Sequence, residues 1–314
     1  MVCVAIVIVT WNSEAEIGGC LDSIDSLIDP RVREVVVVDN ASSDSTVKVA
    51  GEHGATVLPN RENRGFAAAV NQGVRNSAAP LILLLNPDAH ILGGLDAMSA
   101  HFRDPKVGAV GGQLIGSDGK IQRGFMVRRF PTAATLVFEV LGLNRIWPGN
   151  PVNWHYRCLD NDPMLEAQVD QPAGAFVMFS RAAWQDVGEF DERFWPLWFE
   201  DVDFFARLKK AGFTTLYTPL ARAKHAGSHS IAKLKLENRE TYWYGNLLEY
   251  AAKHYSPAAF RTVCAAVAVG AGFRACARVP HIGLKAIAVY SKVLSLSVSR
   301  LLGLRKDDGK GLSV

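Results

Sequence analysis

The chain of 314 residues is predicted to fold as an α/β protein, with a mostly parallel sheet flanked by helices. Apolar runs rich in Val, Ile and Leu alternate with segments of helical periodicity through its first half. These runs are apolar at every position, which is typical of strands that helices cover on both faces. The composition, 49% hydrophobic and 21% charged, is that of a globular protein and excludes a disordered or collagen-like chain.

Expected strands and helices alternate over the first 85 residues. Ser42 or Ser43 is the expected N-cap of the second helix, because a serine hydroxyl can accept a hydrogen bond from a free backbone N–H at a helix start. Such alternation predicts parallel strands joined by helical crossovers. The strands are expected at 3–9, 34–38, 56–58 and 81–85, and the helices at 15–27, from Ser45 onward and at 66–76.

The second half of the chain is less regular. Residues 113–170 are rich in Arg, Pro, Asn and Trp, and we expect long loops there. Strands are expected at 172–180 and 213–218. A helix is expected at 200–211, where Gly212 provides a suitable residue to end it.

The N-terminal run and the cysteines bear on localisation. No basic residue precedes the apolar residues 2–9, so we expect a buried strand there rather than a signal peptide. The five cysteines are scattered without a Cys-x-x-Cys pair, which favours free thiols in a reducing compartment. The longest uncharged apolar stretch, between Arg261 and Arg274, is shorter than the roughly 18 residues of a membrane span. We therefore expect a cytoplasmic protein without a conventional membrane-spanning helix.

Charge is distributed unevenly along the chain. Residues 1–203 hold 16 Lys and Arg against 26 Asp and Glu, whereas residues 204–314 hold 18 against 5. If 281–304 form a helix, three basic residues share one face and four apolar residues the opposite face. This tail could lie on the inner face of the cell membrane, or it could pack on the rest of the chain or on a second copy of it in a homodimer. The basic residues are Lys285, Lys292 and Arg300, and the apolar ones are Ile287, Leu294, Val298 and Leu301.

In a parallel sheet the ligand site lies beyond the carboxyl ends of the strands. This rule singles out three loops, which span 10–12, 39–42 and 86–88. The first is Thr-Trp-Asn and lacks the glycines of a dinucleotide-binding fingerprint. The chain also has no Walker motif and no Gly-x-Ser-x-Gly elbow, which disfavours a nucleotide triphosphatase and a serine hydrolase.

Two acidic residues follow expected strands at this edge. Asp39 could accept a hydrogen bond from the N–H of a pyrimidine ring, or it could cap a helix or stabilise a turn. Asp88 could hold Mg²⁺ or Mn²⁺ beside a diphosphate, or it could belong to an ordinary Asn-Pro-Asp turn.

Three acidic residues, Glu200, Asp201 and Asp203, open the helix expected at 200–211, directly after a segment rich in aromatic side chains. Adjacent carboxylates beside aromatic rings suit a general base that acts on a sugar hydroxyl. Acidic residues are also favoured in any first helical turn by the helix dipole.

Two further candidates are basic. His225, in His-Ala-Gly-Ser-His, could supply a neutral imidazole to a metal ion or could be a loop histidine, because Gly227 argues against a helix there. Arg64 precedes an expected helix and could pair with a phosphate at its N-terminus, or it could be a surface residue.

Seven segments taken together resemble the family 2 glycosyltransferases, and most closely their bacterial rhamnosyltransferase-like branch. The resemblance extends over about residues 3–250. The segments are VIVTWN at 7–12, VVDNASSDST at 37–46, NRGFAAAVNQG at 63–73, LLNPDA at 84–89, AGAFVMFSR at 173–181, FDERFWPLWFEDVDFFARLKKAG at 190–212 and HAGSHS at 225–230.

The resemblance implies a GT-A fold and an inverting transfer from a nucleotide sugar, assisted by Mn²⁺ or Mg²⁺. It implies a nucleotide-sugar-binding half, here at 1–112, and an acceptor-binding and catalytic half, here at 113–256. Residues 257–314 carry none of the resemblance and are expected, from their own pattern, to form a basic amphipathic helical tail.

The family motifs also carry roles over to single residues. Asp88 and His225 would hold the metal, with Asn86 standing where the family has a first aspartate. Asp201 would be the catalytic base, with Glu200 orienting it or the acceptor, and Trp198 would contact the acceptor. The donor would be bound by Thr10, Trp11, Asn12, Asp39, Asn40, Arg64, Asn86 and Gly174.

The branch implies dTDP-rhamnose as donor, and a glycan or polyprenyl-linked acceptor used in cell-surface polysaccharide synthesis. A UDP-sugar such as UDP-galactofuranose is the alternative donor. A catalytically silent sugar-nucleotide-binding homologue is a second function class. A nucleic-acid binder is a third, and the tail contains no recognised RNA- or DNA-binding module to support it.

Overall fold

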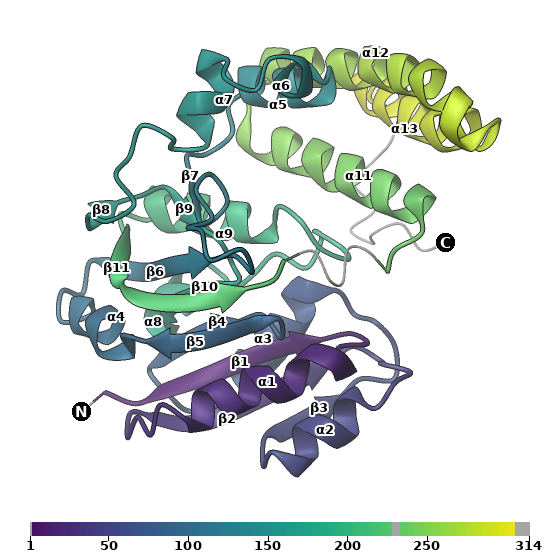
Figure 1. Cartoon of the computed structure of the whole chain (residues 1–314). Coiled ribbons are helices and arrows are strands. Elements are labelled where there is room, and N and C mark those ends of the chain that lie inside the picture. The colour runs from purple at the N-terminus through teal and green to yellow at the C-terminus, as the bar shows by residue number, and fades with distance from the viewer. Residues whose placement is uncertain (1, 228–232, 305–314) are drawn as a thin grey trace. The chain divides into compact units, whose positions relative to one another are not determined.

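The computed structural model describes residues 2–227 and 233–304, and the chain forms two compact units. The first, here called the sheet unit, comprises residues 1–129, 157–192 and 200–232. The second, called the helical unit, comprises residues 130–156, 193–199 and 233–314. The sheet lies entirely in the first unit (Figure 1).

The main sheet has the strand order β3-β2-β1-β4-β10-β6-β11-β5, with the short β8 paired to β11. Strands β1 to β4 run parallel, whereas β10 is antiparallel to both of its neighbours, β4 and β6. A second sheet pairs β7 with β9. The bounds are β1 Val4–Thr10, β2 Val32–Asp39, β3 Thr56–Pro59, β4 Leu81–Leu85, β5 Ala89–Gly93, β6 Val107–Ile115, β7 Val127–Arg128, β8 Ala167–Gln168, β9 Gln171–Pro172, β10 Phe176–Ser180 and β11 Thr214–His225.

Helices cover this sheet because its central strands are apolar on both faces. Ile6 and Ile8 of β1 join one buried cluster with Ile17 of α1. Gly73 of α3 lies against Val7 on the other face, so close that a Cβ there would stand 2.5 Å from a Val7 methyl group. The helices of this unit are α1 Glu14–Asp25, α2 Thr46–Glu52, α3 Phe66–Arg75, α4 Leu95–His101, α8 Arg181–Asp186 and α9 Glu200–Lys210.

The predicted α/β class is confirmed, with corrections to single elements. The N-cap position of α2 is held by Ser45 and not by Ser42 or Ser43, because Ser42 is bonded to Asp39 instead. The segment 113–170, expected as long loops, contains several short helices and strands. Strand β11 does not stop near residue 218 but continues to His225, because it pairs with β5 there.

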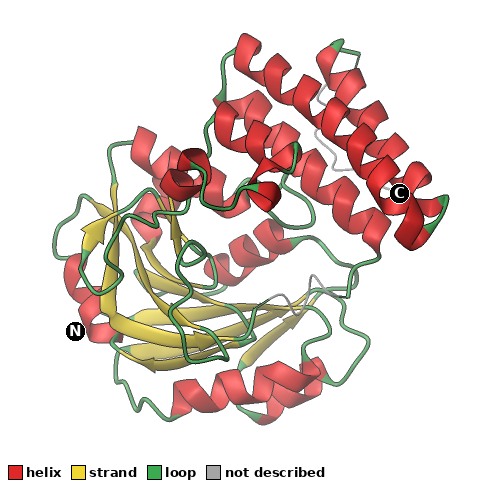
Figure 2. Cartoon of the chain, turned by 45° about the horizontal axis from the view of Figure 1, so that its top comes forward, coloured by secondary structure: helices red, strands yellow, loops and turns green. Residues whose placement is uncertain are grey.

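The regular elements of the helical unit are helices, drawn red in Figure 2. These helices share an apolar cluster of their own. Tyr244 of α11, Val263 of α12 and Tyr290 of α13 are members of that cluster. Gly270 of α12 allows a close approach, since a Cβ there would meet the carbonyl oxygen of Val140 at 2.2 Å. The helices are α5 Ala133–Val140, α6 Leu143–Ile146, α7 Pro151–Tyr156, α11 Leu236–His254, α12 Pro257–Ile282 and α13 Lys285–Leu301.

The basic tail packs within the helical unit. Its buried face is not the apolar face that was predicted from the periodicity of residues 281–304. Val289, Tyr290 and Val293 face inward, whereas Ile287 is 47% exposed. Arg300 is not part of a free basic face, because its guanidinium lies 3.0 Å from the Glu249 carboxylate.

Helix α12 also corrects the expectation about membrane spans. Its 26 residues are long and apolar enough to cross a membrane by length and composition, although a count of uninterrupted uncharged residues misses it. One third of its most apolar 18-residue window is buried inside the protein.

Candidate active site

Strand register brings the predicted site loops to one edge of the sheet. Thr10, at the end of β1, pairs with Asp39 at the end of β2. Ile8 pairs with Leu85, so Asp88 follows at the same edge. Phe176 lies opposite Leu85, which places Gly174 there, and the antiparallel pairing of β11 with β5 brings His225 beside Ala89.

Asp39 is buried and hydrogen-bonded within its own loop. Its Oδ1 accepts from Thr10 Oγ1 at 2.9 Å, and its Oδ2 accepts from the backbone N–H of Ser42 at 2.9 Å. Asn12 crosses to the same loop, where its N–H donates to Ser42 Oγ at 2.7 Å and its Oδ1 accepts from the N–H of Ser43. The turn role of Asp39 is thus present. A carboxylate has about four lone-pair sites, so Asp39 retains acceptor capacity for a ligand.

Asn40 and Arg64 meet on the other side of this loop. The Asn40 amide donates to the carbonyl oxygen of Gly65 at 3.1 Å, and its Oδ1 accepts from Asn60 at 3.1 Å. These bonds tie the loop to the start of α3, where the side chain of Arg64 is exposed. Trp11 is partly buried beside Thr10. The donor-binding assignments of these residues remain predictions.

Asp88 and His225 form a buried pair. Asp88 Oδ1 lies 3.6 Å from His225 Nε2, and Asp88 Oδ2 accepts from the backbone N–H of Gly227 at 2.9 Å. The turn before Asp88 is held by the N–H of Asn86, which donates to the carbonyl oxygen of Ala175 at 3.0 Å. His229, the second histidine of the motif, lies outside the described residues.

The His225 ring is held from its other side by Gln122. Its Nδ1 lies 3.0 Å from Gln122 Oε1, and the Gln122 amide donates to the backbone carbonyl oxygen of His225 at 2.9 Å. An amide oxygen can only accept, so Nδ1 carries the proton and Nε2 presents its lone pair toward Asp88. Phe125 stacks on the ring at 5.2 Å. Burial lowers the pKa of His225, partly opposed by the Asp88 charge, and so favours the neutral imidazole that a metal requires.

The donor atoms of this pair fit a divalent cation that is held jointly with another molecule. Among the residues that the structure describes, no group of three or more His, Cys, Asp and Glu side chains could hold a metal ion. One carboxylate and one imidazole suit Mg²⁺ or Mn²⁺ when phosphate oxygens or waters complete the coordination. Gln122 bonds the ring nitrogen that faces away from Asp88, and a hydrogen bond at that nitrogen orients the metal-binding histidine in many metal sites.

Asp201 and Glu200 begin α9 at the same edge. Asp201 Oδ1 accepts from the N–H of Val202 at 2.8 Å, and the backbone N–H of Gly174 also bonds this carboxylate. Burial raises the pKa of Asp201, whereas these two N–H groups and the charge of Arg128 lower it. Glu200 is more deeply buried, and burial followed by the Asp201 charge raises its pKa well above the usual range. Burial thus favours the protonated form at both carboxylates, and at Asp201 the two N–H groups and Arg128 oppose it.

Helix α9 is anchored firmly enough to position Asp201. The buried carboxylate of Asp203 pairs with Arg207 at 2.7 Å, and Arg207 also donates to the carbonyl oxygen of Glu189 at 2.7 Å. Phe204 stacks on Phe190 at 4.3 Å. Asp203 therefore has a structural role, whereas its neighbours Glu200 and Asp201 lie at the sheet edge.

Trp198, the predicted acceptor contact, belongs to the helical unit. Its backbone has a positive φ of 79°, and its segment is held by Asn246, whose amide donates to the carbonyl oxygen of Leu197 at 2.8 Å. The contact with an acceptor remains a prediction.

Three residues of the site belong to no sequence motif, and all come from segment 113–170, which was expected to be loop. Gln122, Phe125 and Arg128 contact or polarise His225 and Asp201. Arg128 is itself held by a bond from its Nε to the carbonyl oxygen of Gly124 at 2.9 Å. Their spacing in the sequence does not indicate a site. They reach it only because β7 pairs with β9 and because the chain turns back toward the site after β6.

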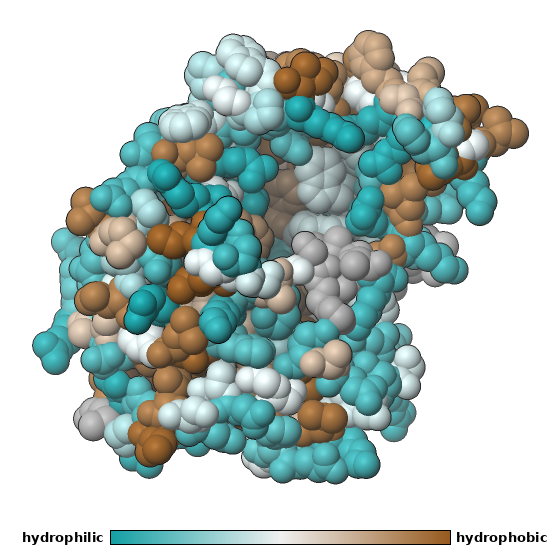
Figure 3. Space-filling view, viewed as in Figure 1, coloured by the Kyte–Doolittle hydropathy of each residue, from teal (hydrophilic) through white to brown (hydrophobic). Residues whose placement is uncertain are grey.

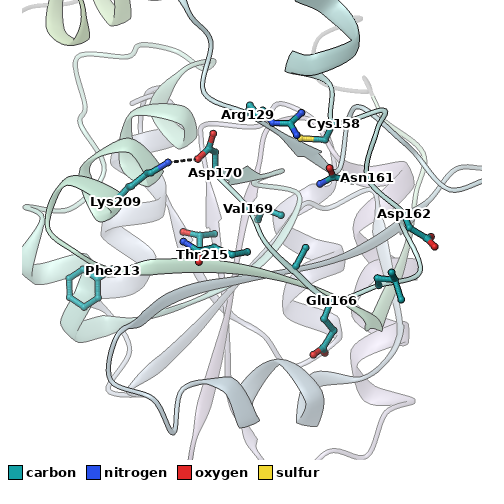
Figure 4. Close-up of a pocket in the computed structure, with 13 residues that line it drawn as sticks. Arg129, Cys158, Asn161, Asp162, Glu166, Val169, Asp170, Lys209, Phe213 and Thr215 are labelled. Atoms are coloured by element: carbon teal, nitrogen blue, oxygen red, sulfur yellow. Dashed lines mark hydrogen bonds and ion pairs between the residues drawn. The ribbon is translucent and has the colours of Figure 1, made fainter.

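A pocket of about 580 Å³ lies elsewhere in the sheet unit and contains none of the predicted site residues. Figure 4 shows its lining side chains, among them Lys209 paired with Asp170. Lys209 and Thr215 lie at the end of α9 and the start of β11, whereas Asp201 and His225 lie at the opposite ends of these elements. The pocket thus lies toward the other ends of α9 and β11.

Comparisons with known proteins bear on this site. The family model for glycosyl transferase family 2 matches residues 5–188. An N-acetylglucosaminyl-diphospho-decaprenol L-rhamnosyltransferase of Mycobacterium tuberculosis is 30% identical over 262 residues, which cover 76% of this chain and 82% of the relative. The low-salt glycan biosynthesis hexosyltransferase Agl10 of Haloferax volcanii is 24% identical over 211 residues, covering 66% of this chain and 61% of the relative.

Solved structures share the fold at low identity. The crystal structure of GalNAc-T7 with UDP, GalNAc and Mn²⁺ matches with a TM-score of 0.58 and 14% identity, over 80% of this chain and 48% of that one. The mannosyltransferase PcManGT from Pyrobaculum calidifontis, in complex with GDP-Man and Mn²⁺, matches with a TM-score of 0.53 and 18% identity, over 96% and 88%. These likenesses confirm the predicted GT-A fold. Together with the family match and the mycobacterial relative, they show that the chain belongs to glycosyltransferase family 2, in its rhamnosyltransferase-like branch.

Proposed function

We propose that this glycosyltransferase moves L-rhamnose from dTDP-rhamnose, with inversion, to a lipid-linked glycan acceptor in the synthesis of cell-surface polysaccharide. The observation that carries the proposal is the meeting of two kinds of group at one sheet edge: the buried Asp88–His225 pair and the α9 carboxylate of Asp201. The name of the mycobacterial relative supports the choice of sugar and acceptor.

The donor nucleotide would lie in the loops after β1 and β2. Asp39 has acceptor capacity to receive the ring N–H of thymine, and Thr10 and Ser42 hold its carboxylate in place. The exposed Arg64 at the start of α3 would pair with the diphosphate, assisted by the positive end of the helix dipole.

Asp88 and His225 would hold a divalent cation together with the diphosphate. Such an ion supplies Lewis-acid stabilisation of the charge that develops on the departing diphosphate. Mn²⁺ in the GT-A neighbours supports a divalent cation here as well.

Asp201 would act as the general base. Its carboxylate takes the proton of the acceptor hydroxyl while the hydroxyl oxygen bonds to the anomeric carbon and the bond from that carbon to the diphosphate breaks. A single displacement of this kind inverts the anomeric configuration. The charge of Arg128 favours the ionised form of Asp201 and so opposes the effect of its burial, whereas burial favours the protonated form of the neighbouring Glu200.

The test is a thermal-shift series on the purified protein with dTDP-rhamnose, UDP-sugars and GDP-sugars, each with and without Mn²⁺ or Mg²⁺. A ligand that binds only the folded state raises Tm by mass action. We expect a metal-dependent rise with dTDP-rhamnose. A rise with UDP-sugars alone would favour the UDP-sugar transferase instead. A rise with dTDP-rhamnose in a protein that transfers no sugar to any acceptor would favour the silent homologue, and no rise with any nucleotide would contradict the donor site itself.

A second measurement tests the stereochemistry. The product formed from dTDP-rhamnose and a polyprenyl-diphosphate-linked acceptor is analysed by NMR for its anomeric configuration. Retention of the donor's configuration would contradict the single-displacement role of Asp201.

A further inference from the structure

Helix α12 leaves a row of apolar side chains exposed. Ala265, Val269, Phe273 and Ala277 follow one another at intervals of four residues and so share a face of the helix. Phe273 is 67% exposed and Val269 52% exposed. The turn that follows adds Leu284, which is 78% exposed. Figure 3 shows hydrophobic side chains gathered at the far end of this α12–α13 hairpin.

The opposite face of α12 is fixed within the helical unit. Val263, Cys264 and Val267 are fully buried. Arg274 donates to the carbonyl oxygens at the end of α5, at 2.9 Å to that of Glu139. The exposed row is therefore held in place at the surface, on a helix that already has packing partners on its other side.

The charge of the hairpin has one sign. Residues 257–304 contain six Lys and Arg and no Asp or Glu. Several of these cations are used inside the unit, since Arg278 lies 3.8 Å from Glu240 and Arg300 pairs with Glu249. Arg261 and Lys285 are exposed, and no acidic partner is found for either among residues 2–227 and 233–304.

Exposed aromatic and aliphatic side chains beside unpaired cations are the pattern by which a helix lies in the interface of an anionic membrane. A second copy would bring no negative charge to Arg261 and Lys285 from the same face, because residues 257–304 hold no Asp or Glu, whereas an anionic lipid headgroup would. We propose that the α12 row and Leu284, here called the hairpin face, contact the surface of an anionic phospholipid membrane. This placement deepens the proposed function, because a polyprenyl-linked acceptor is itself held in a membrane, but the contact needs no donor or metal.

The experiment is co-sedimentation of the full chain with vesicles of phosphatidylcholine, with and without phosphatidylglycerol. We expect binding to the anionic vesicles and little to the neutral ones. Phe273→Glu combined with Leu284→Glu is expected to abolish binding, and Lys285→Glu to weaken it roughly fivefold or more. The controls are Leu220→Glu and Lys48→Glu, which alter an exposed leucine and an exposed lysine of the sheet unit. Point variants are preferred to removal of residues 257–314, because that truncation would uncover the apolar cluster that α12 and α13 share with α11.

Each outcome decides the question. Binding that the hairpin variants lose and the controls keep supports the membrane contact. Equal binding by wild type and hairpin variants overturns it, as does no binding by the wild type. A dimer in light scattering that Phe273→Glu converts to monomer, without vesicle binding, overturns it in favour of a second copy. Thermal shift with dTDP-rhamnose is run on every variant, so that a failure of the donor proposal is recorded separately.

Discussion

The two units of this glycosyltransferase differ in charge, in architecture and in what they share with relatives. The sheet unit holds 19 Lys and Arg against 25 Asp and Glu, and the helical unit holds 15 against 6. The family match at 5–188 falls mainly in the sheet unit, which also carries every predicted metal and catalytic residue. Strand pairing brings the predicted metal-binding residues of the sheet unit to one edge of the sheet, whereas the exposed α12 row lies in the helical unit. We therefore expect substitutions at the site in the sheet unit to reduce catalysis, and substitutions on the hairpin face of the helical unit to reduce membrane binding.

The sharpest test removes the proposed base. Asp201→Asn is expected to lower kcat by roughly 10²- to 10⁴-fold, the usual contribution of a positioned base, and to leave the thermal shift with donor unchanged. Asp186→Asn, an exposed residue of the same unit, serves as the control. Near-normal turnover by Asp201→Asn would show that another residue is the general base.

The next test addresses the support of the metal-binding pair. Gln122→Leu removes the acceptor for His225 Nδ1 and is expected to weaken Mn²⁺ binding by roughly 10- to 100-fold, as for other outer partners of metal ligands. Gln122→Glu keeps an acceptor oxygen and is expected to retain more affinity. Mn²⁺ binding is measured by electron paramagnetic resonance with nucleotide diphosphate present. The exposed Gln168→Leu is the control, and unchanged affinity in Gln122→Leu would remove Gln122 from the site.

A smaller effect is expected in the pH dependence of catalysis. Burial raises the pKa of Asp201, so kcat/KM should rise with pH as this group loses its proton, at a pH above the ordinary aspartate range near about 3.9. Arg128 favours the ionised form, and Arg128→Met should therefore move this rise to higher pH. The shift is measured from profiles of kcat/KM against pH, with Arg222→Met, which alters an exposed arginine, as the control. A rise at the same pH in Arg128→Met would show that Asp201 does not set it.

The smallest effect concerns stability. The folded chain holds the Glu200 proton to higher pH than the unfolded chain does, because burial raises the pKa of Glu200. The free energy of unfolding should therefore fall as pH rises from the unfolded value near about 4.3 toward the raised value. Glu200→Gln should lack this fall and gain stability relative to wild type at neutral pH. Urea unfolding at several pH values measures it, with the exposed Glu62→Gln as control, and parallel pH curves would contradict it.

Sequence patterns predicted the part of the fold in which local and global signals agree. The runs that form β1, β2 and β4 are short and largely apolar. Their alternation with helical segments favours a parallel sheet over other arrangements. Segment 113–170 could not be predicted in this way, because its elements are short and owe their form to partners distant in sequence, as when β7 pairs with β9.

The candidate site was predictable to the extent that its residues end strands. Asp39, Asp88 and Asp201 follow from motifs at strand ends or a helix start, whereas Gln122 and Arg128 lie in no motif. The tail illustrates another limit. Periodicity placed Ile287 opposite Lys285, yet only packing against α11 and α12 decides which face of α13 is buried.

The path of the chain between the units constrains how such a protein can be taken apart. The chain leaves the sheet unit after Arg129 and returns at Arg157. It leaves again after Glu192 and returns at Glu200, one residue before the proposed base. Neither unit is thus a continuous stretch that a gene could gain or lose as a module. New acceptor or surface preferences in such a chain would have to arise by substitution within it, and chimaeras between relatives would need junctions at each crossing, including one beside Asp201.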